Sequence, residues 1–193
     1  MAVSRTDLFM SHLSYKEVGT VSEREQLKKK MHDARASLPD SIRNSNVGCW
    51  RNEVQYPDAE WLIGGLHEMI EEAIEFYKEA DPTFARAIQK NQISLQSWSN
   101  INEPGSFNAL HSHPESTFAC VYYVQAEGTG ALKFPNPVNL LNNYYTVSPY
   151  MRGIVFEPKD GELVLFPGWL PHEVGINTSD KQRMNIAFQV TVS

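Results

Sequence analysis

The sequence predicts an α+β protein that is mainly β, in which N-terminal helices support a jelly-roll core. Apolar residues recur at helical spacing early in the chain, whereas short alternating or apolar runs dominate later. Turn signals separate these runs at intervals of roughly ten residues, which is typical of a sandwich or barrel. The chain of 193 residues is expected to form a single domain, with a helical N-terminal scaffold over 1–90 and the β core over 91–193.

Two helices are expected in the scaffold. Ser22 and Glu25 have the spacing of a capping box, and the polar stretch that follows, up to Leu38, predicts the first helix. A second helix is expected over 58–80, because its apolar residues recur three and four positions apart while Glu and Lys occupy the other face. Pro82 is expected to end it. Its acidic polar face argues against a membrane-surface role.

Six later runs are typical of strands, since they alternate in polarity or are short and apolar. They are QISLQSW (92–98), TFACVYYV (117–124), GALKF (130–134), GIVF (153–156), ELVLF (162–166) and QRMNIAFQVTV (182–192). Turn signals lie between them at EPG (103–105), EGTG (127–130) and KDG (159–161). Short strands separated in this way favour a jelly-roll over a helical or parallel α/β fold.

One segment, 136–153, is polar, aromatic and irregular. Loops of this kind are often functional lids or excursions from the fold. Its tyrosines Tyr144, Tyr145 and Tyr150 are candidate contacts to a substrate, and the alternative is that they pack the loop against the barrel.

Composition narrows the class of protein. A formal net charge of −6 offers no basic face for nucleic acid or an anionic membrane. No run approaches the ~18 apolar residues that cross a bilayer, and the N-terminus lacks the pattern of a secretion signal. The two cysteines, Cys49 and Cys120, cannot form a disulfide framework. A reducing, cytoplasmic location is therefore expected.

Three histidines form a candidate metal site. His111 and His113 stand two positions apart, so on a strand they share one face. Alone, such a pair is usually explained by structural or surface histidines. His172 follows a buried strand and a turn, where it could lie at the mouth of the barrel opposite the first two. Three imidazoles arranged in this way leave coordination positions open and suit Fe(II) as well as zinc.

Arg183 is a candidate anion-binding residue. In the last strand run, Met184 and Ile186 share one face, whereas Arg183 and Asn185 share the other. If the apolar face packs against the helices, Arg183 points into the barrel. A guanidinium buried there is costly unless an anion meets it. The alternative is an exposed arginine at the end of a strand.

Together these residues resemble the 2-oxoglutarate- and Fe(II)-dependent oxygenase superfamily, which is built on the double-stranded β-helix. The similarity is greatest to an uncharacterised group of the superfamily that carries HxHP and LFPxWLxH motifs. The motifs here are WSN (98–100), HSHP (111–114), VYYV (121–124) and LFPGWLPH (165–172), in the same order. The resemblance covers about half of the chain. It extends to proteins of marine bacteria and their viruses, so for a viral source the expected location is the host cytoplasm.

The resemblance implies roles for individual residues. His111 and His172 match the histidine ligands of the iron, and Arg183 matches the basic residue that pairs with the distal carboxylate of 2-oxoglutarate. Tyr123 matches a strand tyrosine that bonds the same carboxylate, and its alternative role is a core aromatic. The asparagines Asn100, Asn108 and Asn185 are expected to face the mouth of the barrel, without an assigned role.

The second ligand departs from the superfamily pattern. His113 occupies the position that usually holds a carboxylate. Either three imidazoles, His111, His113 and His172, hold the metal, or the register shifts and Glu115 replaces His111. The three-histidine set is favoured, because Glu115 lies in the expected turn before the next strand.

Two other functions remain open at this point. Gly105 followed by His111-x-His113, and the stretch 161–167, resemble the two halves of a cupin motif. Thr117 and Phe118 stand where a cupin usually has glutamate, however, and a cupin does not need the arginine. The third interpretation is a jelly-roll binding module that carries no metal.

The expected function is that of a 2-oxoglutarate-dependent dioxygenase, an oxidoreductase. The resemblance implies Fe(II) as cofactor, 2-oxoglutarate as cosubstrate, and hydroxylation of a substrate with release of succinate and CO2. The expected partners are 2-oxoglutarate, O2 and a prime substrate that the sequence does not identify. A homodimer is compatible with the sequence, and neither nucleic acid nor a membrane is expected as a partner.

Overall fold

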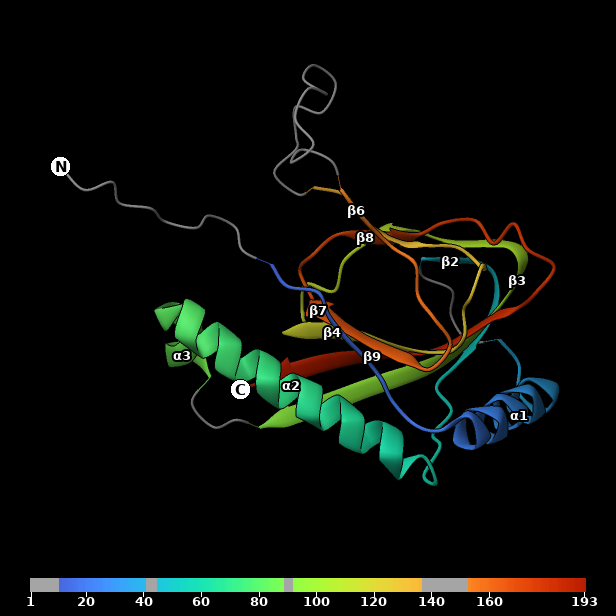
Figure 1. The fold of residues 1–193 in the computed structure, drawn as a ribbon, viewed down its shortest axis with the longest axis horizontal. Helices are drawn as coiled ribbons and strands as arrows, with labels where there is room; N and C mark the ends of the chain where they lie inside the picture. Colours follow the sequence, from blue (N-terminus) through green and yellow to red (C-terminus); the bar gives the residue numbers. More distant parts are fainter. Residues whose placement is uncertain (1–10, 41–44, 89–91, 137–152) are drawn as a thin grey trace, which may run out of the picture.

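The computed structural model describes residues 11–40, 45–88, 92–136 and 153–193 (Figure 1). The helices in these ranges are α1 (Val21–Ser37), α2 (Glu60–Ala80) and α3 (Pro82–Ala87). The strands are β1 (Ser14–Glu17), β2 (Asn46–Asn52), β3 (Ile93–His111), β4 (Phe118–Gln125), β5 (Leu132–Phe134), β6 (Ile154–Phe156), β7 (Glu162–Pro167), β8 (His172–Val174) and β9 (Arg183–Val192). The chain is thus mainly β with few helices, as its sequence predicts.

The described strands form one curled antiparallel sheet in the order β1-β7-β4-β9-β3-β8-β5-β6, with β2 paired to the other edge of β3. In Figure 1 the sheet wraps around an interior, while α2 and α3 lie against its outer face. This curled half-barrel is the arrangement expected of a double-stranded β-helix, so the predicted fold class is confirmed.

Successive side chains of a strand point to opposite faces of the sheet, so the apolar residues form two separate clusters. On β9, Met184, Ile186 and Phe188 face α2 and belong to the larger cluster, which also holds Leu66 and Ile70 of that helix. The smaller cluster lies inside the curl and consists of buried residues such as Ala119, Tyr123, Val164 and Phe166. The apolar stripe of α2 therefore covers the outside of the sheet, and the inside is left for polar residues of β3 and β9.

Strand β3 contains the expected turn EPG at 103–105 without ending there. Phe107 pairs with Val47 and Asn102 pairs with Cys49, so the intervening β3 residues bulge out of the ladder. Gly105 sits in this bulge with a φ of +83°, a conformation that favours glycine. The prediction of a turn that ends the strand was wrong, because the bulge bends the strand while its pairing with β2 continues. The turns at 127–130 and 159–161 are found as predicted.

The N-terminal segment holds two strands that the sequence analysis did not anticipate. Strand β1 pairs with β7, and β2 pairs with β3, so both belong to the sheet. Four residues of β1 are too few to show a period, and their pairing partners lie about 150 positions later, for example Leu165 opposite Ser14. The tyrosines Tyr144, Tyr145 and Tyr150 lie outside the described residues.

Two further observations concern the described part of the chain. No helix there is both long and apolar enough to cross a membrane. Cys49 and Cys120 are both buried, and they form no disulfide with a described residue.

Helix α1 begins two residues earlier than predicted. Its N-cap is Thr20, whose side chain accepts a hydrogen bond from the backbone N–H of Glu23, while the Glu23 carboxylate accepts from the backbone N–H of Thr20. The sequence carries the same spacing at Ser22 and Glu25, and that pair was the wrong choice. The buried face of the helix carries Leu27 and Met31.

We expect Thr20→Ala to lower the free energy of unfolding by about 1 kcal/mol, because the first turn of α1 loses its cap. The matched control is Ser22→Ala, which should change it by less than about 0.5 kcal/mol, as is usual at exposed positions without such a role. Urea unfolding followed by circular dichroism measures both. A larger loss for Ser22→Ala would place the cap at the position first predicted.

Candidate functional site

A cavity of about 450 Å³ opens into the interior of the curled sheet. Its walls come from β2, β3, β4, β8 and β9, and its volume lies within the range of about 300–1,000 Å³ that is usual for ligand sites. The candidate residues from the sequence that line it are His111, His113, Glu115, Tyr123, His172, Arg183, Asn100, Asn108 and Asn185.

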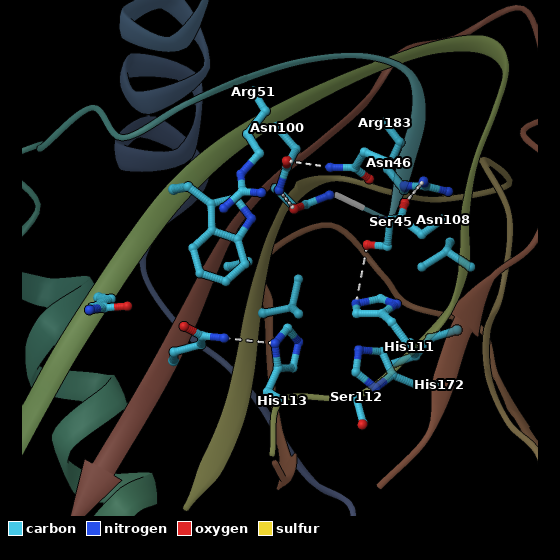
Figure 2. Close-up of a pocket in the computed structure, with 18 of the residues that line it drawn as sticks. Ser45, Asn46, Arg51, Asn100, Asn108, His111, Ser112, His113, His172 and Arg183 are labelled. Atoms are coloured by element: carbon cyan, nitrogen blue, oxygen red, sulfur yellow. Dashed lines mark hydrogen bonds between the residues drawn. The ribbon is translucent and has the colours of Figure 1, made fainter. Parts of the chain in front are cut away.

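The three histidines converge at one end of this cavity (Figure 2). Each offers a ring nitrogen, and the three nitrogens lie within 4.8 Å of one another. The ring centroids are 4.2 Å apart for His111 and His172, and 5.1 and 5.2 Å from His113 to these two. Such a cluster is close enough for all three rings to ligate one metal ion. Among the described residues, these three histidines are the group of His, Cys, Asp or Glu side chains that lie close enough to hold one metal ion.

From the sequence, His172 is expected to lie opposite His111 and His113 across the barrel, and the structure differs from this expectation. His111 ends β3 and is the direct cross-strand partner of His172, which begins β8, so these two lie on adjacent strands and not on opposite sides of a barrel. His113 lies beyond the end of the strand. Its backbone N–H donates to the carbonyl of Gly168 over 2.7 Å, which ties the HxH loop to the turn before β8.

Hydrogen bonds at Nδ1 fix the ring orientation of two histidines. Nδ1 of His111 lies 2.7 Å from the carbonyl oxygen of Ala109, and Nδ1 of His172 lies 2.9 Å from that of Leu170. A carbonyl oxygen can only accept, so each Nδ1 carries the proton and each Nε2 keeps its lone pair. Nε2 of His111 is also 3.3 Å from the hydroxyl of Ser45. Two of the three rings are therefore in the tautomer that ligates a metal through Nε2.

His113 has a different neighbour. The side-chain amide nitrogen of Gln189 lies 2.9 Å from its Nδ1, so Nδ1 accepts in this arrangement. If the side-chain amide of Gln189 rotates by half a turn, its oxygen faces Nδ1 of His113. Nδ1 then carries the proton, and Nε2 has the lone pair that can bind a metal. Gln189 can thus match either tautomer of this ring.

Burial keeps the three imidazoles neutral. Desolvation and the charge of His111 lower the pKa of His172 to about 3. The same two causes, with a smaller effect of Arg51, lower the pKa of His113 to about 4. The pKa of His111 is also lowered by burial, while its bond to Ala109 opposes the shift. At neutral pH the rings are therefore in the uncharged form that metals require.

Arg183 is buried on the inner face of β9, with 1% of its surface exposed. Its two terminal nitrogens donate to the carbonyl of Thr129 and to the side-chain oxygen of Asn108, both over 3.1 Å. Its Nε–H has no hydrogen-bond partner among the described residues, and no described carboxylate forms a salt bridge with it. Tyr123 lies close by, since Arg183 opposes the rise that burial causes in the pKa of this phenol. A cation is therefore held in the cavity wall without a described counter-charge.

A row of amides connects the arginine side of the cavity to its centre. The amide of Asn46 donates to the oxygen of Asn100 over 2.7 Å, and that of Asn100 donates to the oxygen of Asn185 over 2.8 Å. Both bonds cross between neighbouring strands, which leaves this wall polar but largely satisfied.

Some lining residues were missed by the sequence analysis. Gln189 continues the alternation of Arg183 and Asn185 on β9, and this signal was available in the sequence. Asn46 and Arg51 lie on β2, which was not predicted, so nothing pointed to them. Glu115 lies at an exposed position in the turn before β4, as expected, and it is not part of the histidine cluster.

Comparison with known proteins agrees with this fold. Among the structures that resemble the chain are a prolyl-4-hydroxylase of Pseudomonas putida (15% identity, TM-score 0.62, covering 94% of this chain and 92% of that one) and HygX of Streptomyces hygroscopicus with nickel and 2-oxoglutarate bound (10% identity, TM-score 0.57, 94% and 83%). A third is a prolyl hydroxylase of Trichoplax adhaerens in complex with a hypoxia inducible factor peptide fragment (12% identity, TM-score 0.56, 93% and 83%). At these identities the likeness concerns the fold alone.

The sequence also matches a family directly. No match was found among curated protein sequences. Residues 96–189, which run from β3 to near the end of β9 and include the three histidines and Arg183, match the family described as "Putative 2OG-Fe(II) oxygenase". This part of the chain therefore matches a family of 2-oxoglutarate- and Fe(II)-dependent oxygenases, and the solved structures show that the fold of the chain is similar to theirs.

Proposed function

We propose that this chain is an Fe(II)- and 2-oxoglutarate-dependent dioxygenase that hydroxylates a substrate with release of succinate and CO2. One observation carries the proposal. A cluster of three neutral imidazoles and a buried arginine without a described counter-charge line the same cavity. The first suits a divalent transition metal and the second suits an organic anion, which are the two components that this reaction needs.

The donor set fits Fe(II). Imidazole is a common ligand of iron, and the Nδ1 hydrogen bonds of His111 and His172 leave their Nε2 atoms unprotonated. In this proposal His113 is the third ligand, oriented by Gln189. Three neutral ligands leave both positive charges of the metal without compensation by the protein, so the site should favour an anionic cosubstrate.

The neighbourhood of Arg183 fits the distal carboxylate of 2-oxoglutarate. Thr129 and Asn108 hold the guanidinium in place, and its Nε–H remains to be satisfied. A buried donor of this kind costs free energy until an acceptor reaches it. Tyr123 would add a phenol to the same carboxylate. The role of these two residues in binding 2-oxoglutarate is part of the proposal.

When bound, Fe(II) with 2-oxoglutarate supplies the activation of O2 that oxidises the substrate. The protein's own residues have other tasks. His111, His113 and His172 hold and orient the metal, and Arg183 with Tyr123 orients the cosubstrate. The buried walls of the curled sheet limit the access of water to the reacting groups.

A cupin-type metalloenzyme or a metal-free binding module explains these features less well. Neither needs a buried arginine in the cavity wall, and the histidine tautomers have no purpose in a module without metal. We therefore do not carry either as a second proposal.

The direct test is an anaerobic titration. Adding Fe(II) and then 2-oxoglutarate to the purified protein should produce the weak visible charge-transfer band of a chelate, and admitting O2 should bleach it as succinate forms. A protein that stays colourless, and that binds neither Fe(II) nor Mn(II) in calorimetry, would exclude the oxygenase function.

Ligand substitutions test the histidine set. We expect His111→Ala, His113→Ala and His172→Ala each to abolish tight binding of Fe(II), because each removes a metal bond. Glu115→Ala should leave the affinity within the roughly 10–100-fold loss that an outer-shell change causes. The matched control is His67→Ala on the exposed face of α2, which should change nothing. Loss of iron from Glu115→Ala with retention in His111→Ala would support the shifted register instead.

Substitution of the arginine tests the cosubstrate site. Arg183→Ala should keep its metal but bind 2-oxoglutarate more weakly by about 2–4 kcal/mol, as is typical when one partner of a buried charge pair is removed. Calorimetry on protein loaded with Mn(II) measures this affinity. Arg86→Gln on α3, which removes the same charge far from the cavity, serves as control. If Arg183→Ala bound 2-oxoglutarate as tightly as the unsubstituted protein, Arg183 would not be the residue that binds its distal carboxylate.

A further inference from the structure

The hydroxyl of Ser45 lies at the atom of His111 that the proposed function assigns to the metal. Ser45 is half-buried in the cavity wall just before β2, and its Oγ is 3.3 Å from Nε2 of His111. Nδ1 of this ring carries the proton, because it donates to the carbonyl of Ala109. Nε2 therefore accepts, and the hydroxyl of Ser45 donates to its lone pair.

This hydrogen bond and a metal ion compete for one lone pair. The unprotonated nitrogen of a neutral imidazole serves either a hydrogen-bond donor or a metal. Binding of a metal through Nε2 of His111 thus requires the hydrogen bond from Ser45 to break. Ser45 has no other side-chain hydrogen bond among the described residues, so its hydroxyl then needs a new acceptor. An O–H group that is shielded from water and has no acceptor costs free energy.

The backbone holds Ser45 between the histidines and the buried arginine. Its carbonyl accepts from the backbone N–H of Ala109 over 2.9 Å. The preceding residue of β3, Asn108, accepts a hydrogen bond from Arg183 with its side-chain oxygen over 3.1 Å. Figure 2 shows Ser45 between His111 on one side and Arg183 with Asn108 on the other. Ser45 therefore lies between the candidate metal ligands and the candidate anion-binding residue.

This position decides which acceptor can reach the hydroxyl. In the proposed function 2-oxoglutarate joins the metal to Arg183, and Ser45 stands between these two positions. The carboxylate and keto groups of this molecule only accept hydrogen bonds. A hydroxyl that donates to an anionic oxygen forms a stronger hydrogen bond than one that donates to a neutral nitrogen, so the exchange of acceptors favours binding of the cosubstrate.

We propose that Ser45 binds 2-oxoglutarate: its hydroxyl donates to His111 in the metal-free protein and turns to an oxygen of the cosubstrate when a metal takes the lone pair. Metal binding thereby releases the donor that the cosubstrate uses, so one side chain couples the two binding events. Ser45 lies outside residues 96–189, and the family match therefore does not imply this role. The inference rests on the proposed function, which supplies the metal and 2-oxoglutarate.

Removal of the hydroxyl should shift two affinities in opposite directions. We expect Ser45→Ala to bind Mn(II) about 2- to 10-fold more tightly, because a neutral hydrogen bond no longer competes with the metal. The same variant, once saturated with Mn(II), should bind 2-oxoglutarate at least about fivefold more weakly, because it lacks a hydrogen bond to a charged group. Isothermal titration calorimetry measures both affinities, first with Mn(II) alone and then with 2-oxoglutarate.

Further variants separate this role from a structural one. Ser45→Thr keeps the hydroxyl and should bind both Mn(II) and 2-oxoglutarate nearly as the unsubstituted protein does. Ser112→Ala removes another serine hydroxyl from the lining of the same cavity, next to His111, and should change neither affinity. If Ser45→Ala does not fold, Ser45→Gly removes the same hydroxyl and should show the same opposite shifts.

Two results would overturn the inference while leaving the proposed function intact. One is an unchanged affinity of Ser45→Ala for 2-oxoglutarate, which would mean that the hydroxyl does not bind the cosubstrate. The other is unchanged or weaker binding of Mn(II) by Ser45→Ala, which would mean that the hydroxyl does not compete with the metal. Absence of 2-oxoglutarate binding to the unsubstituted protein saturated with Mn(II) would instead exclude the proposed function, and the inference with it.

Discussion

The bend of one long strand organises this molecule. Strand β3 spans 19 residues, pairing with β9 before its bulge and with β8 after it. The first part places Asn102 opposite Arg183, and the last residue places His111 opposite His172. Arg183 and the pair of His111 and His172 are therefore held by the same strand, on the two sides of its bulge. A straight strand could not join both, because the sheet would not curl around the cavity.

Burial of polar groups inside the curled sheet costs free energy, and several features of the fold reduce this cost. Two hydrogen bonds join the asparagine row, although the buried side-chain oxygen of Asn46 has no partner among the described residues. The histidines remain uncharged because burial lowers their pKa values. Burial also lowers the pKa of Arg183, but a guanidinium is not deprotonated in proteins. The cavity thus keeps a positive charge near a neutral set of candidate metal ligands, an arrangement that favours the approach of anions.

The family pattern and the local chemistry of this chain differ at one position. Where a carboxylate usually stands, His113 offers an imidazole whose tautomer depends on Gln189. The exchange removes a negative charge from the centre.

The sequence by itself determined the positions of the later strands along the chain, the amphipathic helix α2 and the separation of Arg183 from Met184 on opposite faces of β9, because each depends on a local period of polarity. It also indicated the three histidines, through their spacing and their motifs. Only the tertiary structure decided that His111 and His172 are direct strand partners, that the turn residues at 103–105 form a bulge, and that β2 brings Asn46 and Arg51 to the cavity. Pairing between distant segments leaves no period in either segment alone. The part of the cavity that comes from the core strands could therefore be predicted, whereas the residues that β2 contributes could not.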